Sequence, residues 1–378
     1  MFAYYPVTSK AQQSILQETL SDPVDIPPTT WTVIKKSALD YREEFDVSGL
    51  NAAFKLEKYL PSNSIIKKVK QEYHSYSDPN ITSETQYLDV FYPESSTTSN
   101  PTLIWIHGGG WVSGDKSQIA NYIQVIASEF KNQALKDLTV VGVNYSIAPE
   151  SQYPTPLLQV NNAIKYLLDH ASDFHIDTSK LALAGDSAGS QIAAQIAALY
   201  TNPTYIDQLQ TQNQVTIDIP TLADPEEPLI KCIVLCCGGY NLKTLVQYDS
   251  YKDNVLGFKD FVDTVTIAYS GDLDPANETK FDTFSVANYI VENFPPSFIT
   301  VGNGDPLKEQ SKELDEILSK LAVSISKPEI KPETFYPPEG KLLPLLPHEY
   351  QFDLDDKDGY GKQALAKIVS FLKVKLIG

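Results

Sequence analysis

The pentapeptide GDSAG at Gly185–Gly189 constrains the fold of this chain more than any other feature. It directly follows the apolar run Lys180–Ala184, and the alanine- and isoleucine-rich stretch Ser190–Tyr200 after it is expected to form a buried helix. The pattern is typical of a serine held on a sharp strand-to-helix turn, where glycines prevent collisions with neighbouring backbone. Ser187 is therefore the candidate nucleophile, with a helix N-cap as its structural alternative.

A glycine-rich segment lies upstream of this serine. The apolar run Leu103–Ile106 leads into the sequence HGGGW at His107–Trp111, which has the form of a loop whose backbone N–H groups bind an oxyanion. A flexible turn would also explain the glycines. The two motifs nevertheless agree in order and context, which favours a shared role.

Together the two motifs resemble those of the hormone-sensitive-lipase-like esterases, which have the α/β-hydrolase fold. The segment Val143–Glu150, followed by Tyr153 and Pro154, is similar to the tyrosine-x-x-alanine-proline-glutamate stretch of that family. The likeness covers roughly residues 85–375. It implies an α/β fold in which helices flank a mostly parallel central sheet, with an N-terminal cap and an inserted cap.

The family orders its catalytic triad as serine, acid and then histidine. Of the five histidines, only His348 follows Ser187. Asp305 comes shortly after the apolar strand predicted at Ser297–Val301, and the sequence that it begins, Asp305–Leu307, resembles the acid motif of the family. A helix N-cap is the alternative role for this aspartate. The resemblance thus implies a triad of these three residues.

These residue types suit acyl transfer. His348 would take the proton of the Ser187 hydroxyl and later return it to the leaving group, while Asp305 would orient the imidazole. His107 is expected to brace the glycine loop. The backbone N–H groups expected to bind the oxyanion are those of Gly109, Gly110 and Ala188, with Gly108 as a reserve candidate.

Two further residues are candidates for the substrate pocket. Asp186 lies beside the nucleophile in the sequence, and Trp111 follows the glycine loop. The indole of Trp111 could line the pocket, or it could equally pack beneath the loop.

Apolar runs alternate with amphipathic stretches, as a mostly parallel sheet covered on both faces requires. Strands are predicted at 87–92, 102–106, 139–144, 180–184, 230–235, 297–301 and 333–336. Helices are predicted at 119–132, 156–170, 308–321 and 362–376. In the last helix, a stripe at helical spacing should face the sheet: Ala364, Ile368, Phe371 and Val374.

We divide the chain into an N-terminal cap region, residues 1–80, and a catalytic domain, residues 81–378. Two insertions of cap or loop are expected in the catalytic domain. The first, at about 201–228, is rich in Gln, Asp, Thr and Pro, which predicts an extended surface loop. The second, at about 241–292, could supply apolar walls through Leu256–Phe258 and Phe261.

Composition limits the partners and the location. The formal net charge of −18 argues against nucleic acid or an anionic membrane surface as the main partner. No apolar run reaches the roughly eighteen residues of a membrane-spanning helix, and the N-terminus lacks a basic segment that leads into an apolar one. A cytoplasmic location without membrane insertion is therefore predicted. A homo-oligomer is left open.

The three cysteines, Cys232, Cys236 and Cys237, lie in or just after the strand predicted at 230–235. Burial in a strand predicts packing, rather than a disulfide or a metal site.

The resemblance implies a carboxylic ester hydrolase that acts on short-chain acyl esters through an acyl-enzyme, with a small-molecule ester as its partner and no metal or cofactor. One alternative is an amide hydrolase with the same triad, such as an aryl formamidase or a small exopeptidase. The other alternative is a non-catalytic ligand-binding receptor of the same fold.

Overall fold

The computed structural model describes residues 28–46, 56–60, 66–73, 86–221, 227–247, 258–274, 279–340 and 345–378. Most of the predicted cap region 1–80 lies outside these ranges. Leu256 and Gly257, two of the predicted apolar wall residues, lie outside them as well.

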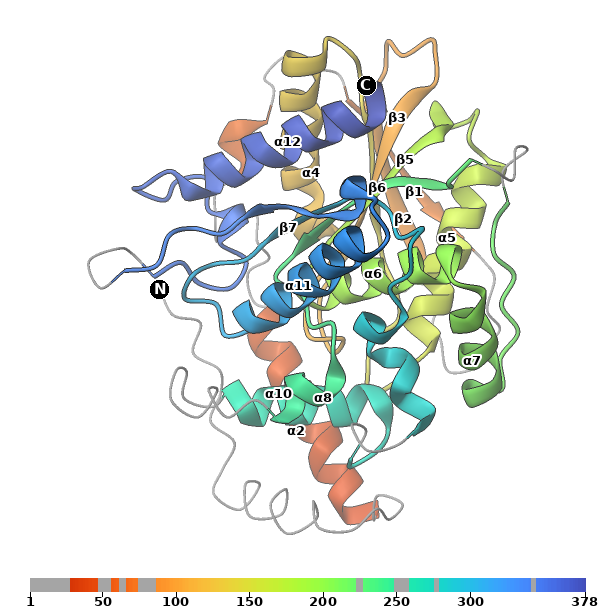
Figure 1. Ribbon diagram of the computed structural model, residues 1–378, viewed down its shortest axis with the longest axis vertical. Coiled ribbons are helices and arrows are strands. Elements are labelled where there is room, and N and C mark those ends of the chain that lie inside the picture. Colours follow the sequence, from red (N-terminus) through yellow and green to blue (C-terminus); the bar gives the residue numbers. More distant parts are fainter. Residues whose placement is uncertain are drawn as a thin grey trace.

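The described chain forms an eight-stranded sheet in the order β1-β2-β4-β3-β5-β6-β7-β8 (Figure 1). β1 pairs with β2, and β2 with β4, in antiparallel fashion, whereas every pair from β4 to β8 is parallel. The strands are β1 (Ile66–Glu72), β2 (Tyr87–Pro93), β3 (Asn100–Ile106), β4 (Thr139–Val143), β5 (Ile176–Asp186), β6 (Ile230–Cys236), β7 (Ser297–Thr300) and β8 (Glu333–Phe335).

Helices cover both faces of this sheet (Figure 1). The α-helices are α2 (Pro28–Asp46), α4 (Lys116–Ala134), α5 (Thr155–Asp169), α6 (Ser187–Thr201), α7 (Pro203–Asn213), α8 (Leu242–Gln247), α10 (Phe258–Ser270), α11 (Lys308–Ser324) and α12 (Tyr360–Ile377). Short 3₁₀ helices are η1 (Leu56–Tyr59), η3 (Thr279–Phe284), η4 (Val286–Tyr289), η5 (Pro328–Ile330) and η6 (Tyr350–Phe352). A mostly parallel sheet flanked by helices confirms the predicted fold class.

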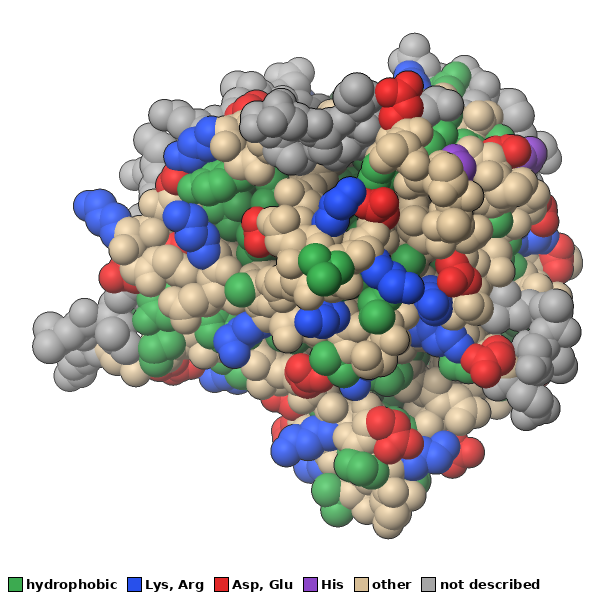
Figure 2. All heavy atoms as spheres, turned by 90° about the horizontal axis from the view of Figure 1, so that it is seen from above, with side chains coloured by type: hydrophobic (Ala, Val, Ile, Leu, Met, Phe, Trp, Pro, Cys, Tyr) green, Lys and Arg blue, Asp and Glu red, His purple; other side chains and the backbone are tan. Residues whose placement is uncertain are grey.

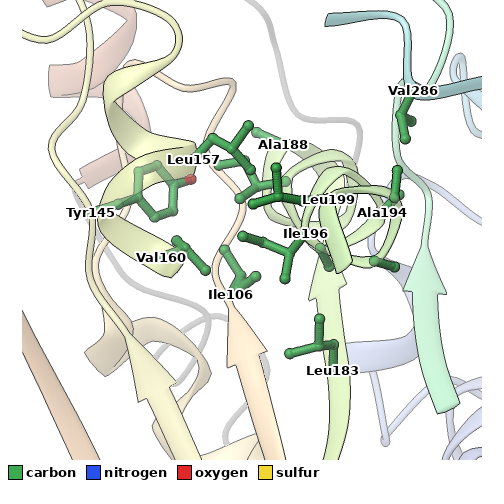
Figure 3. Packing of buried hydrophobic residues seen from close by; sticks show 14 of the residues in the cluster. Ile106, Tyr145, Leu157, Val160, Leu183, Ala188, Ala194, Ile196, Leu199 and Val286 are labelled. Carbon is green, nitrogen blue, oxygen red and sulfur yellow. The ribbon is translucent and has the colours of Figure 1, made fainter. Parts of the chain in front are cut away.

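Side chains that alternate in direction along the strands divide the hydrophobic core into two layers, one on each face of the sheet. In β3, Ile104 and Ile106 pack with α5, α6 and α11, whereas Leu103 and Trp105 pack with α4 and α12. Successive side chains of a strand point to opposite faces, so a strand covered on both sides is apolar throughout. Figure 3 shows the first layer, where Ile106 of the sheet lies beside side chains of α5 and α6.

The predicted strands correspond to β2 through β8. β1 was not predicted, because its sequence IKKVKQE lacks an apolar alternation. It lies within the segment 1–80 that was assigned to the cap, yet it pairs with β2 along its whole length. This part of the segment therefore belongs to the sheet.

Two local predictions were wrong. The expected loop at 201–228 contains the helix α7, which begins with Pro203 and is capped by the side chain of Asn202, an acceptor for the Tyr205 N–H at 3.2 Å. In α12, Val374 does not face the sheet, because it is 55% exposed and the buried stripe continues through Leu372 and Leu376.

No described helix is both long and apolar enough to cross a membrane. Acidic and basic side chains are interspersed over the face of the molecule seen in Figure 2.

Candidate active site

Three adjacent parallel strands, β5, β6 and β7, end at one edge of the sheet. Ser187 follows β5 directly, Cys237 follows β6, and Asp305 follows β7 after a short loop. In open α/β sheets, ligands bind outside the carboxyl ends of the strands. The sheet topology therefore places the predicted nucleophile and acid at the edge where a site is expected.

The nucleophile turn is tightly constrained. Ser187 has a φ of +51°, in the left-handed region that side-chain-bearing residues rarely adopt. A Cβ at Gly185 would overlap the backbone of Gly189, and a Cβ at Gly189 would overlap the carbonyl oxygens of Ile106 and His107. Both motif glycines are thus required by space. The N-cap of α6 is Asp186, so the N-cap alternative for the serine is not supported.

The structure brings the predicted acid and base together. His348 Nδ1 lies 2.9 Å from Asp305 Oδ2, and the other carboxylate oxygen accepts the Leu307 N–H at 2.7 Å. Burial alone would lower the pKa of His348, but the charge and hydrogen bond of Asp305 raise it well above its usual value. The site therefore stabilises the imidazolium that forms when this histidine accepts a proton.

Cys237 also belongs to this cluster, which the sequence analysis missed. The cysteines are buried and free, as predicted, but atoms of Cys237, Asp305 and His348 all lie within 4.8 Å of one another. Burial raises the pKa of the Cys237 thiol to about 11, so it is neutral at neutral pH. Cysteine, aspartate and histidine are zinc-binding types, but here the imidazole and the carboxylate are already paired with each other.

The glycine loop turns sharply away from β3. Gly109 and Gly110 have φ values of +116° and +60°, and the Gly109 carbonyl accepts the Ser113 N–H at 3.0 Å. The Gly108 N–H donates to Asp186 Oδ2 at 2.8 Å. Within the described residues, no protein acceptor takes the N–H of Gly109 or Gly110. This geometry favours the N–H groups of Gly109 and Gly110, rather than that of Gly108, as donors to an oxyanion.

His107, the first residue of the HGGGW segment, packs against Tyr145. Their rings stack with centroids 4.4 Å apart, and the Tyr145 hydroxyl donates to the His107 carbonyl at 2.8 Å. This position agrees with the bracing role expected for the histidine.

The two pocket candidates are both buried. Asp186 is 1% exposed, and its oxygens accept the Trp105 indole N–H at 2.6 Å and the Gly108 N–H. Trp111 is 5% exposed, and its indole stacks on Tyr269 with centroids 5.3 Å apart. The tryptophan therefore packs beside the loop, and the Asp186 carboxylate is bound by the protein itself.

Two helices from the predicted cap segments cover the glycine loop. α2 packs against α10 (Figure 1). Tyr41 meets Phe261 edge to face, with ring centroids 5.1 Å apart. A Cβ at Gly110 would lie 2.8 Å from Phe261 Cζ. Phe261 thus forms an apolar wall over the loop.

Arg42 fastens α2 to the site. Its Nε donates to the Val112 carbonyl at 2.7 Å, and its Nη2 donates to the Ala148 carbonyl and to Glu150 Oε2, both at 2.6 Å. Burial raises the pKa of Glu150, but hydrogen bonds and the charge of Arg42 outweigh this and lower it. The glutamate of the sequence motif at 143–150 therefore serves to dock this helix.

Replacing Arg42 with alanine is expected to lower the free energy of unfolding by about 2 kcal/mol, because two carbonyl groups lose a charged donor. Urea denaturation would measure the loss. Lys36→Ala is the control, since the Lys36–Asp40 pair on the same helix is exposed and should contribute less than about 0.5 kcal/mol. Equal stability of both variants would show that Arg42 does not fasten the helix.

Known proteins resemble this chain in sequence. A family model described as BD-FAE matches residues 88–318. An acetyl esterase of Salmonella paratyphi B is 25% identical over 64% of this chain and 68% of its own length. An arylacetamide deacetylase of Oryctolagus cuniculus is 32% identical over 44% of each chain. Across these and other relatives, the match spans between 44% and 68% of the relative's length.

Solved structures share the fold. A hyperthermophilic esterase from the archaeon Pyrobaculum calidifontis superimposes with a TM-score of 0.59 over 98% of this chain and 99% of its own, at 16% identity. The family model covers more than half of the chain. The chain therefore belongs to the BD-FAE family and has the α/β-hydrolase fold, and its relatives include proteins named acetyl esterase and carboxylesterase.

Proposed function

We propose that this chain is a serine carboxylesterase that hydrolyses short-chain acyl esters through an acyl-enzyme. The observation that carries the proposal is the hydrogen bond between His348 Nδ1 and Asp305 Oδ2, at the sheet edge where Ser187 occupies a left-handed turn. An imidazole bound through Nδ1 leaves Nε2 to act as the general base.

In this mechanism the Ser187 oxygen attacks the ester carbonyl while His348 Nε2 takes the hydroxyl proton. The carbon–oxygen bond to the alcohol then breaks, and the histidine gives the proton to the leaving alkoxide. A water molecule attacks the acyl-enzyme with the same base, which releases the carboxylic acid and restores the serine. Asp305 holds the imidazole and stabilises its charged form throughout.

The negative charge on the tetrahedral oxygen would be met by the N–H groups of Gly109, Gly110 and Ala188. Each such donor typically contributes about 3 kcal/mol to the lowering of the barrier. The left-handed turns at the two glycines support this assignment, as does the engagement of the Gly108 N–H by Asp186.

A short acyl group is favoured by two observations. Phe261 lies against Gly110, where it would restrict the space beside the oxyanion. One relative is named an acetyl esterase. An amide hydrolase is the second candidate, because another relative is named an arylacetamide deacetylase and the same groups can expel an amine once the histidine protonates it.

Turnover of p-nitrophenyl acetate, butyrate and laurate, compared with that of p-nitroacetanilide, tests the proposal. We expect kcat/KM to be highest for acetate or butyrate, at least about tenfold lower for laurate, and lower for the anilide than for acetate. Faster hydrolysis of the anilide would make the chain an amide hydrolase. Turnover of none of these compounds would contradict both candidates.

A further inference from the structure

Two carboxyl groups meet beside the proposed triad. Asp186 immediately precedes Ser187, and Glu349 immediately follows His348. An oxygen of each side chain faces the Cα of Gly108, and the interaction between the two carboxyl groups raises the pKa of Glu349. Because a carboxylate has no proton to donate, two carboxyl groups can share a hydrogen bond only when one of them is protonated. Two carboxyl groups held this close are therefore expected to share a proton.

The surroundings decide which group carries the proton. Asp186 accepts N–H groups on both oxygens, from Trp105 at 2.6 Å and from Gly108 at 2.8 Å. Burial raises the pKa of Asp186, but these two donors stabilise its ionised form and oppose that rise. For Glu349, burial and the nearby charge of Asp186 raise the pKa to about 8. At neutral pH Glu349 is thus the acid that donates, and Asp186 is the carboxylate that accepts.

The pair also touches the glycine loop and the histidine segment. A Cβ at Gly108 would overlap Asp186 Oδ2 and lie 3.0 Å from Glu349 Oε1, so both oxygens face the Cα of that glycine. Glu349 Oε1 lies 4.0 Å from His348 Nε2. The backbone at Glu349 has a φ of +59°, which is unusual for a residue with a side chain. The two carboxyl groups are therefore held between the glycine loop and the segment that carries His348.

We propose that Asp186 and Glu349 are a proton-sharing pair of positioning residues that holds the glycine loop in register with His348, so that loss of the shared proton lowers activity on the alkaline side. This inference rests on the proposed esterase function. Neither residue forms a bond to the substrate. Their effect acts through the Gly108 N–H and through the backbone that carries the imidazole.

The direction in which activity changes with pH distinguishes titration of this pair from titration of His348. When Glu349 loses its proton, two adjacent carboxylates repel each other, and activity should fall near pH 8. Deprotonation of His348 has the opposite effect, because the general base must be neutral to act. Among the residues that the structure describes, the other titratable groups that interact with the pair are Asp305, Cys236, Cys237, Tyr122 and Tyr145.

These neighbours do not account for an alkaline fall near pH 8. Burial raises the pKa of Cys237 to about 11. Burial also raises the pKa values of Cys236, Tyr122 and Tyr145 well above their usual values. These four groups therefore keep their protons through this range. If the fall in activity at alkaline pH disappears when only Glu349 is changed, the Asp186–Glu349 pair causes that fall.

Folding stability gives a second readout. A carboxyl group whose pKa is higher in the folded state keeps a proton that the unfolded chain loses. Its stabilising contribution is complete below the usual pKa of about 4.5 and is lost as the pH rises through about 8. Glu349→Gln keeps a hydrogen-bond donor but does not titrate. Its melting temperature should therefore rise relative to that of the wild type across this window.

The test compares Glu349→Gln and Glu349→Ala with the wild type, using kcat/KM for p-nitrophenyl acetate and Tm from about pH 5.5 to 9.5. We expect Glu349→Gln to stay within about threefold of the wild type at neutral pH and to lack the alkaline limb, whereas Glu349→Ala loses about tenfold or more throughout. Glu339→Gln is the charge-matched control, because Glu339 is an exposed partner of Lys308 and Lys312, and its profile should match the wild type.

An unchanged alkaline limb in Glu349→Gln, or full activity of Glu349→Ala, would overturn the proposal. If the wild type hydrolyses no ester, the proposed function fails, but the pair is still tested by melting. A Tm difference between Glu349→Gln and the wild type that grows with pH would support the shared proton. A difference that stays constant would exclude it.

Discussion

Replacing Ser187 with alanine is expected to lower kcat for ester hydrolysis by about four to six orders of magnitude, because no acyl-enzyme can then form. The remaining rate would come from the glycine loop acting on a water molecule. The fold should persist, since the change removes one oxygen and adds no volume at the turn. Stopped and continuous assays with p-nitrophenyl acetate, together with thermal melting, would measure both effects.

Ser190→Ala is the matched control for this variant. Ser190 is a buried serine of the same helix, and its hydroxyl lies 2.8 Å from the Tyr240 hydroxyl. Loss of that hydrogen bond should cost about 1 kcal/mol of stability and change kcat by less than about tenfold. Near-normal activity of Ser187→Ala would remove this serine from the mechanism. Complete inactivity of Ser190→Ala would show that the effect is not specific to the nucleophile.

Gly189→Ala is expected to lower the free energy of unfolding by about 3 kcal/mol or more, because its Cβ would overlap the carbonyl oxygens of Ile106 and His107. Both obstacles are backbone, so the end of β3 and the start of α6 would have to move apart. The displacement would also separate Ser187 from the glycine loop, and kcat should fall with stability. Urea denaturation and turnover of the same preparation would measure the two losses.

Gly239→Ala is the control that distinguishes this steric overlap from the general effect of adding a methyl group. At Gly239 a Cβ would meet only the end of the Leu245 side chain, at 3.3 Å. Gly239→Ala should therefore change stability by less than about 1 kcal/mol. If Gly189→Ala unfolds at the same urea concentration as the wild type and keeps its activity, the nucleophile turn and the glycine loop are not packed together as described.

The elements that the sequence predicted well are those set by local pattern. The strands β2 through β7 contain apolar runs, and Gly185 is required by the backbone of Gly189, only four residues away. β1 and α7 were missed because their stability depends on packing. β1 carries mostly charged and polar residues, and α7 contributes only Tyr205 and Leu209 to the core.

The site residues that the sequence could not predict depend on contacts between distant segments. Cys237 meets His348 because β6 lies between β5 and β7, and the sequence alone does not give that order. A signal was present, since this cysteine directly follows a strand, as Ser187 does. Likewise the engagement of the Gly108 N–H depends on where the Asp186 carboxylate points. The boundary at residues 80 and 81 and the cytoplasmic location stay predictions, and the sequence analysis made none for the oligomeric state.

Labelling with a fluorophosphonate probe tests the central claim most directly, because such probes bond covalently to an activated serine. The purified full chain would be incubated with the probe, its turnover of p-nitrophenyl acetate followed, and the modified peptide identified by mass spectrometry. We predict one adduct, on Ser187, that forms in step with the loss of turnover and is absent from Ser187→Ala. Turnover that survives complete labelling, or an adduct on a different serine, would contradict the proposed mechanism.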